Sequence, residues 1–116
     1  MNVSDLIYGR KVESARIEYK RGWNPSKVLH TMCAFANDVE GWGGGYIILG
    51  VDFESGKPEI VGIDEASADS INRELVGMGN LMEPRYLPVS SLEHVDGRAV
   101  FVIWVPAGDR RPYSCP

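Results

Sequence analysis

The sequence predicts an α/β fold, a mixed sheet of about five strands with two main helices packed on it. Three observations support this prediction. Residues 25–38 carry apolar side chains at helical spacing, and residues 46–51 form an unbroken apolar run, typical of a strand covered on both faces. Residues 86–107 contain two strand-like runs separated by Asp96 and Gly97, a strong hairpin signal. The expected order is short helix, strand, helix, hairpin, helix, hairpin.

The N-terminal elements are short. Residues 2–9 read as a weak helix anchored by Leu6 and Ile7. The run "ARIEYKR" then alternates as a strand does, which places Ile17 on one side and the charged residues 18 and 20 on the other. We therefore expect one short strand between two helices.

The two main helices and the middle hairpin follow. Asn24 can cap the first main helix, and Pro25 suits its first position. The run "GKPEIVGID" is expected to pair with the buried strand through a turn around residues 54–56. Residues 65–78 carry Ile71, Leu75 and Met78 at helical spacing and predict the second main helix.

A cluster of glycines, Gly41, Gly43, Gly44 and Gly45, joins the first main helix to the buried strand. It is not a P-loop, because no lysine follows it, and it is not a dinucleotide fingerprint, because the glycines follow a helix and open a strand. The pattern indicates a tight corner with positive φ angles. The alternative is a backbone nest that contacts phosphate.

The bulk properties narrow the class of protein. A chain of 116 residues with 44% hydrophobic residues is expected to form one domain. It has no apolar run of signal-peptide or membrane-span length, so we expect a cytoplasmic protein without membrane partners. Cys33 and Cys115 form no CxxC, and His30 and His94 lack HExxH spacing, which excludes a disulfide scaffold and a structural zinc site.

The charge distribution leaves nucleic-acid binding open. The net charge of -4 argues against it, but residues 10–27 hold six cations against two carboxylates, a local charge of +4. The alternative is a solvated surface without a ligand. Trp23 and Trp42 flank the first main helix and would stack on bases if exposed. The candidate phosphate-binding residues are Arg16, Lys20, Arg21, Lys27, Arg110 and Arg111.

Four stretches together resemble the Schlafen-type AlbA-like domain, whose bacterial members are described as DNA-binding. They are "ESARIEYK", "AFAND", "GGGYIILGVD" with "GKPEIVGID", and "VFVIWVPAGDRRPYSCP", which cover residues 13–116. The sequence departs from the commonest family pattern by a longer segment between Asn37 and Gly44. The resemblance implies an AlbA/Schlafen-like fold. It also implies that the chain is the N-terminal part of a longer protein.

The resemblance also implies a second function. Some eukaryotic Schlafen relatives are metal-dependent endoribonucleases, and their acidic triad falls on Glu13, Glu18 and Asp52. Three carboxylates suit Mg²⁺ or Mn²⁺, and Lys20 would contact the scissile phosphate. Glu13 and Glu18 are five residues apart, so Glu13 must precede the strand if the two converge. The alternative is an ordinary set of ion pairs and turn residues. Asn37 either binds a ligand or satisfies backbone groups at the helix end.

Three functions follow from these patterns. The first is a nucleic-acid-binding module, for DNA in preference to RNA, in a bacterial transcriptional regulator. The second is a divalent-metal-dependent nuclease that uses Glu13, Glu18 and Asp52. The third is a protein-interaction or homo-oligomerisation domain in which the basic stretch is only a surface.

Overall fold

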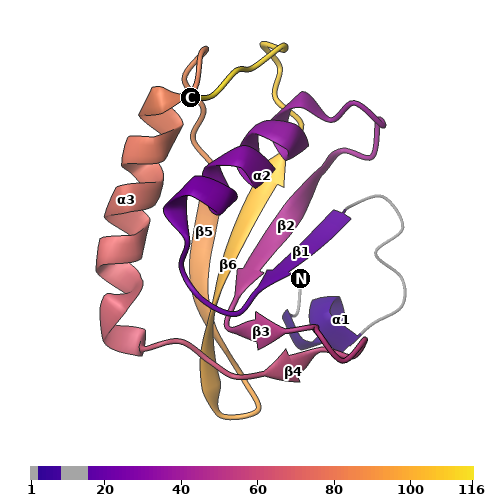
Figure 1. Cartoon of the computed structure of the whole chain (residues 1–116), viewed down its shortest axis with the longest axis vertical. Coiled ribbons are helices and arrows are strands. Elements are labelled where there is room, and N and C mark those ends of the chain that lie inside the picture. Colours follow the sequence, from indigo (N-terminus) through magenta and orange to yellow (C-terminus); the bar gives the residue numbers. More distant parts are fainter. Residues whose placement is uncertain (1–2, 9–15) are drawn as a thin grey trace.

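A four-stranded sheet with the order β1-β2-β6-β5 forms the centre of the protein (Figure 1). The computed structural model describes residues 3–8 and 16–116. The strands of this sheet are β1 (Arg16–Lys20), β2 (Gly44–Leu49), β5 (Val89–Val95) and β6 (Arg98–Pro106). β1 and β2 run parallel, whereas β6 is antiparallel to both β2 and β5. The predicted α/β class is confirmed.

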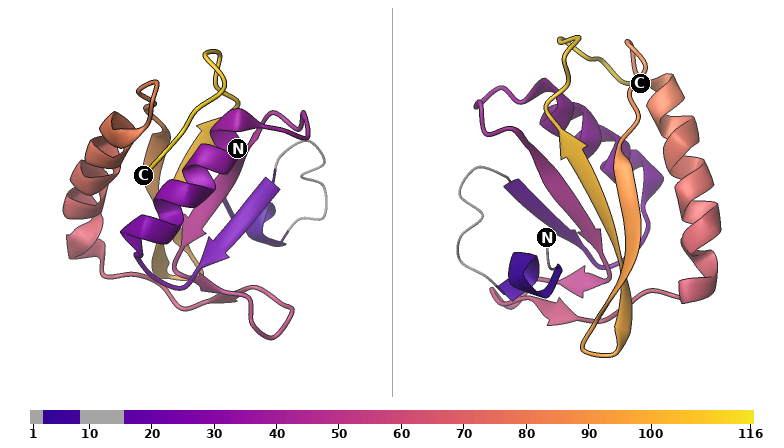
Figure 2. Two further views of the ribbon diagram at one scale, coloured as in Figure 1. Left: turned by 45° about the horizontal axis from the view of Figure 1, so that its top comes forward. Right: turned by 180° about the vertical axis from the view of Figure 1, so that it is seen from behind.

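Helices cover the two faces of this sheet unequally (Figure 2). Helices α2 (Pro25–Asn37) and α3 (Ala68–Leu81) pack on one face, where Met32 and Leu75 meet Ile47 and Ile103 in the larger core cluster. The short helix α1 (Val3–Tyr8) packs on the other face, where Leu6 and Ile7 join a smaller cluster. Leu6 and Ile7 therefore anchor α1 as predicted. In the described part of the chain, no helix is both long and apolar enough to cross a membrane.

The predicted buried strand lies in the middle of the sheet. β2 has β1 on one side and β6 on the other, and Ile47, Ile48 and Leu49 are fully buried. The predicted range of 46–51 is interrupted at Gly50, whose φ of 98° falls where glycine is favoured. A Cβ there would also lie 3.2 Å from the backbone of Gly62. The prediction of a central strand is confirmed, and Gly50 explains why β2 stops at Leu49.

The middle hairpin forms a small sheet of its own. After Gly50, β3 (Val51–Asp52) pairs with β4 (Glu59–Ile60) in a separate two-stranded sheet. Gly50 donates its N–H to the carbonyl of Lys20 at 2.8 Å, and its own carbonyl accepts from Val61 and Gly62. These bonds turn the chain away from the four-stranded sheet. The single sheet of about five strands predicted from the sequence is therefore replaced by four strands plus two.

The helix cap and the hairpin turn that the sequence predicted are both present. The Asn24 side chain accepts the Lys27 N–H at 3.3 Å, and α2 ends at Asn37, one residue before the predicted limit. A short 3₁₀ turn (Glu65–Ser67), capped by Asp64, precedes α3. The turn at Asp96 and Gly97 joins β5 to β6 as predicted.

Candidate nucleic-acid interface

Three of the predicted cations lie together where β1 turns into α2. They line an open depression of about 390 Å³ on the surface. Its lining residues are Tyr19, Lys20, Arg21, Gly22, Trp23, Asn24 and Lys27. The turn brings the end of a strand beside the first turn of a helix, so residues 20, 21 and 27 face one opening.

The three cations differ in exposure. The side chain of Lys20 is only 14% exposed, and its Nζ lies 4.0 Å from an oxygen of Glu18. Arg21 is 69% exposed, and its Nη1 donates to the Asp52 carboxylate at 2.7 Å. Lys27 is exposed, and among the described residues no carboxylate forms an ion pair with it. Lys27 and Arg21 are therefore the cations most accessible to a ligand.

The predicted acidic set is only partly within the described residues. Glu13 lies outside them. Glu18 is exposed on β1, and Asp52 accepts from both Arg21 and the Glu54 N–H. Over residues 3–8 and 16–116, no group of three or more histidines, cysteines or carboxylates is placed to hold a metal ion. The three-carboxylate metal site with Mg²⁺ or Mn²⁺ stays a prediction.

The remaining predicted cations lie elsewhere. Arg16 is the first residue of β1 and pairs with Gly45. Arg111 donates to the carbonyl of Asn37 at 3.4 Å, at the last residue of α2. Arg110 lines a second depression, of about 340 Å³, together with Arg85. Ten residues of helix, about 15 Å, separate Lys27 from Asn37, so the six cations do not form one cluster.

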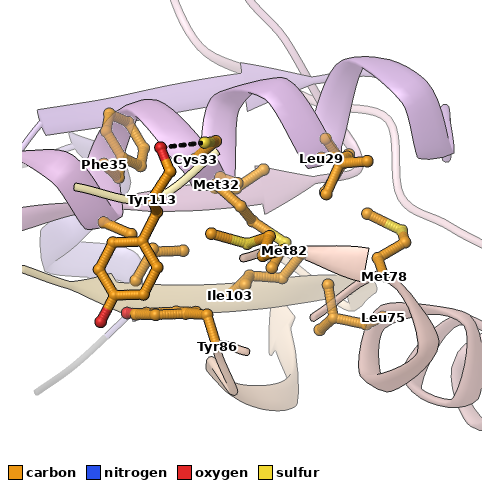
Figure 3. Packing of buried hydrophobic residues seen from close by; sticks show 14 of the residues in the cluster. Leu29, Met32, Cys33, Phe35, Leu75, Met78, Met82, Tyr86, Ile103 and Tyr113 are labelled. Carbon is orange, nitrogen blue, oxygen red and sulfur yellow. Dashed lines mark hydrogen bonds between the residues drawn. The ribbon is translucent and has the colours of Figure 1, made fainter. Parts of the chain in front are cut away.

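Asn37 holds the segment that carries Arg110 and Arg111. Its amide donates to the carbonyl of Tyr113 at 2.9 Å, and its carbonyl oxygen accepts the Tyr113 N–H at 2.6 Å. Tyr113 is buried, and its ring packs edge-on against Tyr86 with 5.5 Å between ring centroids (Figure 3). The Cys33 thiol also donates to the carbonyl of Tyr113, at 3.5 Å. Of the two roles considered for Asn37, the structure shows the second: its side chain forms hydrogen bonds with backbone groups, those of Tyr113.

The glycine-rich turn between α2 and β2 already binds an anionic group, the side chain of Asp38. The Asp38 carboxylate accepts the N–H groups of Trp42, Gly43 and Gly44 at 2.9, 2.9 and 3.2 Å. Desolvation acts to raise the pKa of Asp38, but these three donors and the nearby Arg111 hold it below its ordinary value of 3.8. The tight corner is confirmed. A phosphate nest at these three groups is ruled out, because Asp38 occupies them.

This carboxylate predicts a pH dependence. A depressed folded-state pKa stabilises the fold above the unfolded value, and that stabilisation is lost as pH falls through the folded value. We expect the stability difference between the parent and Asp38→Asn to be largest near neutral pH and to shrink below pH 3.8. Urea unfolding of both proteins between about pH 6 and about pH 2.5 measures it. A difference that is constant over this range would contradict the role of the charge.

The sequence analysis did not single out Phe53, an aromatic residue that contacts Tyr19. Phe53 follows β3, and its ring stacks on Tyr19 with 5.1 Å between centroids and 17° between planes. Trp23, by contrast, packs against the larger core cluster and donates its indole N–H to Glu74 at 2.9 Å. No sequence signal distinguished Phe53 from a core residue, because its contact with Tyr19 depends on where the two-stranded sheet places it.

Comparisons with known proteins agree with the resemblance. A family model described as Schlafen, AlbA_2 matches residues 13–115. The N-terminal domain of a DNA helicase RecG-related protein from Nitrosomonas europaea is 31% identical, with a TM-score of 0.64 over 84% of this chain and 66% of that chain. The DIP2311 protein from Corynebacterium diphtheriae shares the fold at 20% identity and a TM-score of 0.59, over 90% of this chain and 19% of that one.

The chain thus spans just under two thirds of the first structure and about a fifth of the second. The search of curated proteins found no match. The family model nevertheless covers most of the chain, from before β1 to beyond β6. This chain belongs to the Schlafen AlbA_2 family.

Proposed function

We propose that this chain is a nucleic-acid-binding module that contacts phosphates through the depression at the start of α2. The observation that supports this is the convergence of Lys20, Arg21 and Lys27 on one opening in a chain whose net charge is negative. A local group of cations attracts a polyanion even when the whole protein is acidic, because exposed charges are screened beyond about 8 Å at physiological salt. Arg110 and Arg111 form a second, separate contact in this proposal.

DNA is the proposed nucleic acid. The support comes from the resemblance to the Schlafen-type AlbA-like domain noted in the sequence analysis, and from the similar structure whose protein is named for a DNA helicase. We further propose that the chain serves as the DNA-contacting part of a longer bacterial regulator.

Charge reversal tests the proposal. Arg21→Glu combined with Lys27→Glu changes two exposed side chains, so the fold is expected to persist. We expect affinity for DNA to fall at least tenfold at about 0.1 M salt, and the slope of log K against log salt to fall by roughly 1.5 units, since each phosphate contact contributes about 0.7 to 0.9. Fluorescence anisotropy with labelled single-stranded and duplex DNA measures both quantities.

The matched control is Arg73→Glu with Arg98→Glu. Both residues are exposed, neither lines the depression, and the change in net charge is the same. If this control weakens binding as much as the double variant in the depression, net charge alone explains the effect. If neither variant changes the affinity or the salt slope, the depression does not bind nucleic acid.

A nuclease function is the second candidate. Its support is that Glu18 and Asp52, the two described members of the acidic set, each pair with a cation that lines the depression. Incubating the same DNA, and a structured RNA, with and without Mn²⁺ tests it. Cleavage that requires the metal and is lost in Glu18→Gln would support catalysis. If the substrate stays intact at high protein concentration, the nuclease function is excluded and nucleic-acid binding is the only one of the two that remains.

A further inference from the structure

An aromatic stack stands at the margin of the basic depression. Tyr19 contributes to the lining of the depression, while its ring packs against the smaller core cluster on the α1 face and stacks on the ring of Phe53, around the edge strand β1. Phe53 is 45% exposed. Tyr19 covers one face of the Phe53 ring, so a second planar group would have to contact the part of Phe53 that stays exposed.

Hydrogen bonds fix the residues on either side of the stacked rings. The Tyr19 hydroxyl donates to the carbonyl of Ile7 at 3.3 Å. Asp52, which precedes Phe53, is fixed by Arg21, and the Phe53 carbonyl accepts the Gly56 N–H at 3.1 Å. A group that stacks on Phe53 therefore meets a segment whose backbone is already ordered, which favours binding.

The arrangement of ring and cations resembles a site for an unpaired nucleotide. Proteins that bind single strands combine cations that follow the phosphates with aromatic rings on which bases stack. The contact between Arg21 and Asp52 places a guanidinium one residue away from Phe53. A duplex offers such a ring no base face, because its bases are stacked on one another, whereas a single strand does.

We propose that Phe53 is the stacking platform for an unpaired base, so that the depression binds single-stranded DNA in preference to duplex. This inference rests on the proposed function, since Arg21 and Lys27 supply the phosphate contacts. Trp23 is not the platform, because its ring packs against the core and its N–H is bonded to Glu74. Trp42 lies beyond the other end of α2.

Abasic DNA separates stacking from charge. The probes are a labelled oligothymidine and a strand of equal length built from abasic sugar phosphates, which carries the same charge without bases. We expect the parent protein to bind the oligothymidine roughly 5- to 150-fold more tightly than the abasic strand. Phe53→Ala should bind both strands with the affinity that the parent shows for the abasic one. Phe53→Trp should restore the difference, and Phe53→Leu, which keeps an apolar side chain of similar size, should not.

Trp42→Ala is the matched control, an exposed aromatic residue at a distance from the depression. Equal affinity of the parent for both strands, or a loss seen in Trp42→Ala and not in Phe53→Ala, would overturn the platform while leaving phosphate binding intact. A parent that binds duplex DNA as tightly as the oligothymidine would overturn the preference for single strands, whereas failure of the parent to bind single-stranded and duplex DNA alike would overturn the proposed function. The two failures are therefore distinguishable in one set of titrations.

Discussion

Gly44→Ala is expected to lower the free energy of unfolding by more than about 3 kcal/mol. A Cβ at this position would lie 2.1 Å from the carbonyl oxygen of Val105 and 2.7 Å from the Cα of Pro106. Both atoms belong to the backbone of β6, which is paired with β2 and cannot give way cheaply. The φ of 106° adds strain for any residue with a side chain. Urea denaturation followed by circular dichroism measures the loss.

Gly41→Ala is the matched control for this substitution. Gly41 also has a positive φ, 71°, but a Cβ there meets no atom within 4 Å. Its cost is expected to be the conformational strain alone, about 1 to 2 kcal/mol. The difference between the two variants isolates the close approach of β2 and β6. Equal losses would mean that the approach contributes nothing.

Asn37→Ala is expected to cost about 2 to 4 kcal/mol. The substitution leaves the Tyr113 N–H without its partner and the Tyr113 carbonyl with only the weak donor Cys33, and Tyr113 is buried between α2 and Tyr86. Asn37→Asp keeps an acceptor for the Tyr113 N–H but loses the donor to its carbonyl, so it should also be destabilised. Chemical denaturation of each variant gives the free energy of unfolding.

Asn72→Ala provides the comparison for Asn37. Asn72 also lies in a helix and also forms a side-chain hydrogen bond, to Ser90 at 2.8 Å, but both partners are side chains and the bond is exposed. Its loss is expected to stay within about 0.5 kcal/mol. If the two variants lose similar stability, the Asn37 contacts to Tyr113 are not what holds the C-terminal segment.

Elements defined by local signals could be predicted from the sequence. The cap at Asn24, the turn at Asp96 and Gly97, and the apolar run of β2 each depend on residues close in the chain, and each was placed within a few residues. The separation of β3 and β4 from the main sheet could not be predicted. It depends on the Gly50 N–H donating to Lys20 and on the Gly50 carbonyl accepting from Val61 and Gly62, bonds that no local pattern encodes.

The candidate site shows the same division. Lys20, Arg21 and Lys27 could be grouped from the sequence because they flank one turn. The separation of these three residues from Arg110 and Arg111 could not be predicted, because it depends on the contacts of the C-terminal segment with the end of α2. Asp38 was overlooked as the anion of the glycine-rich turn because its three partners become parallel donors only after the loop has folded.

The parallel pairing of β1 and β2 has a consequence for how this surface can change. Parallel neighbours finish at the same edge of a sheet, so Arg21 and Asp52 meet there although 31 residues separate them in the chain. The sheet and the larger core cluster lie behind that edge and contribute their apolar side chains to packing. Exposed residues of the two segments that leave this edge can therefore be substituted while the sheet and the core packing are retained. Variation of Arg21, Gly22 and residues 53–55 would change this surface without touching the cap at Asn24 or the packing of Trp23.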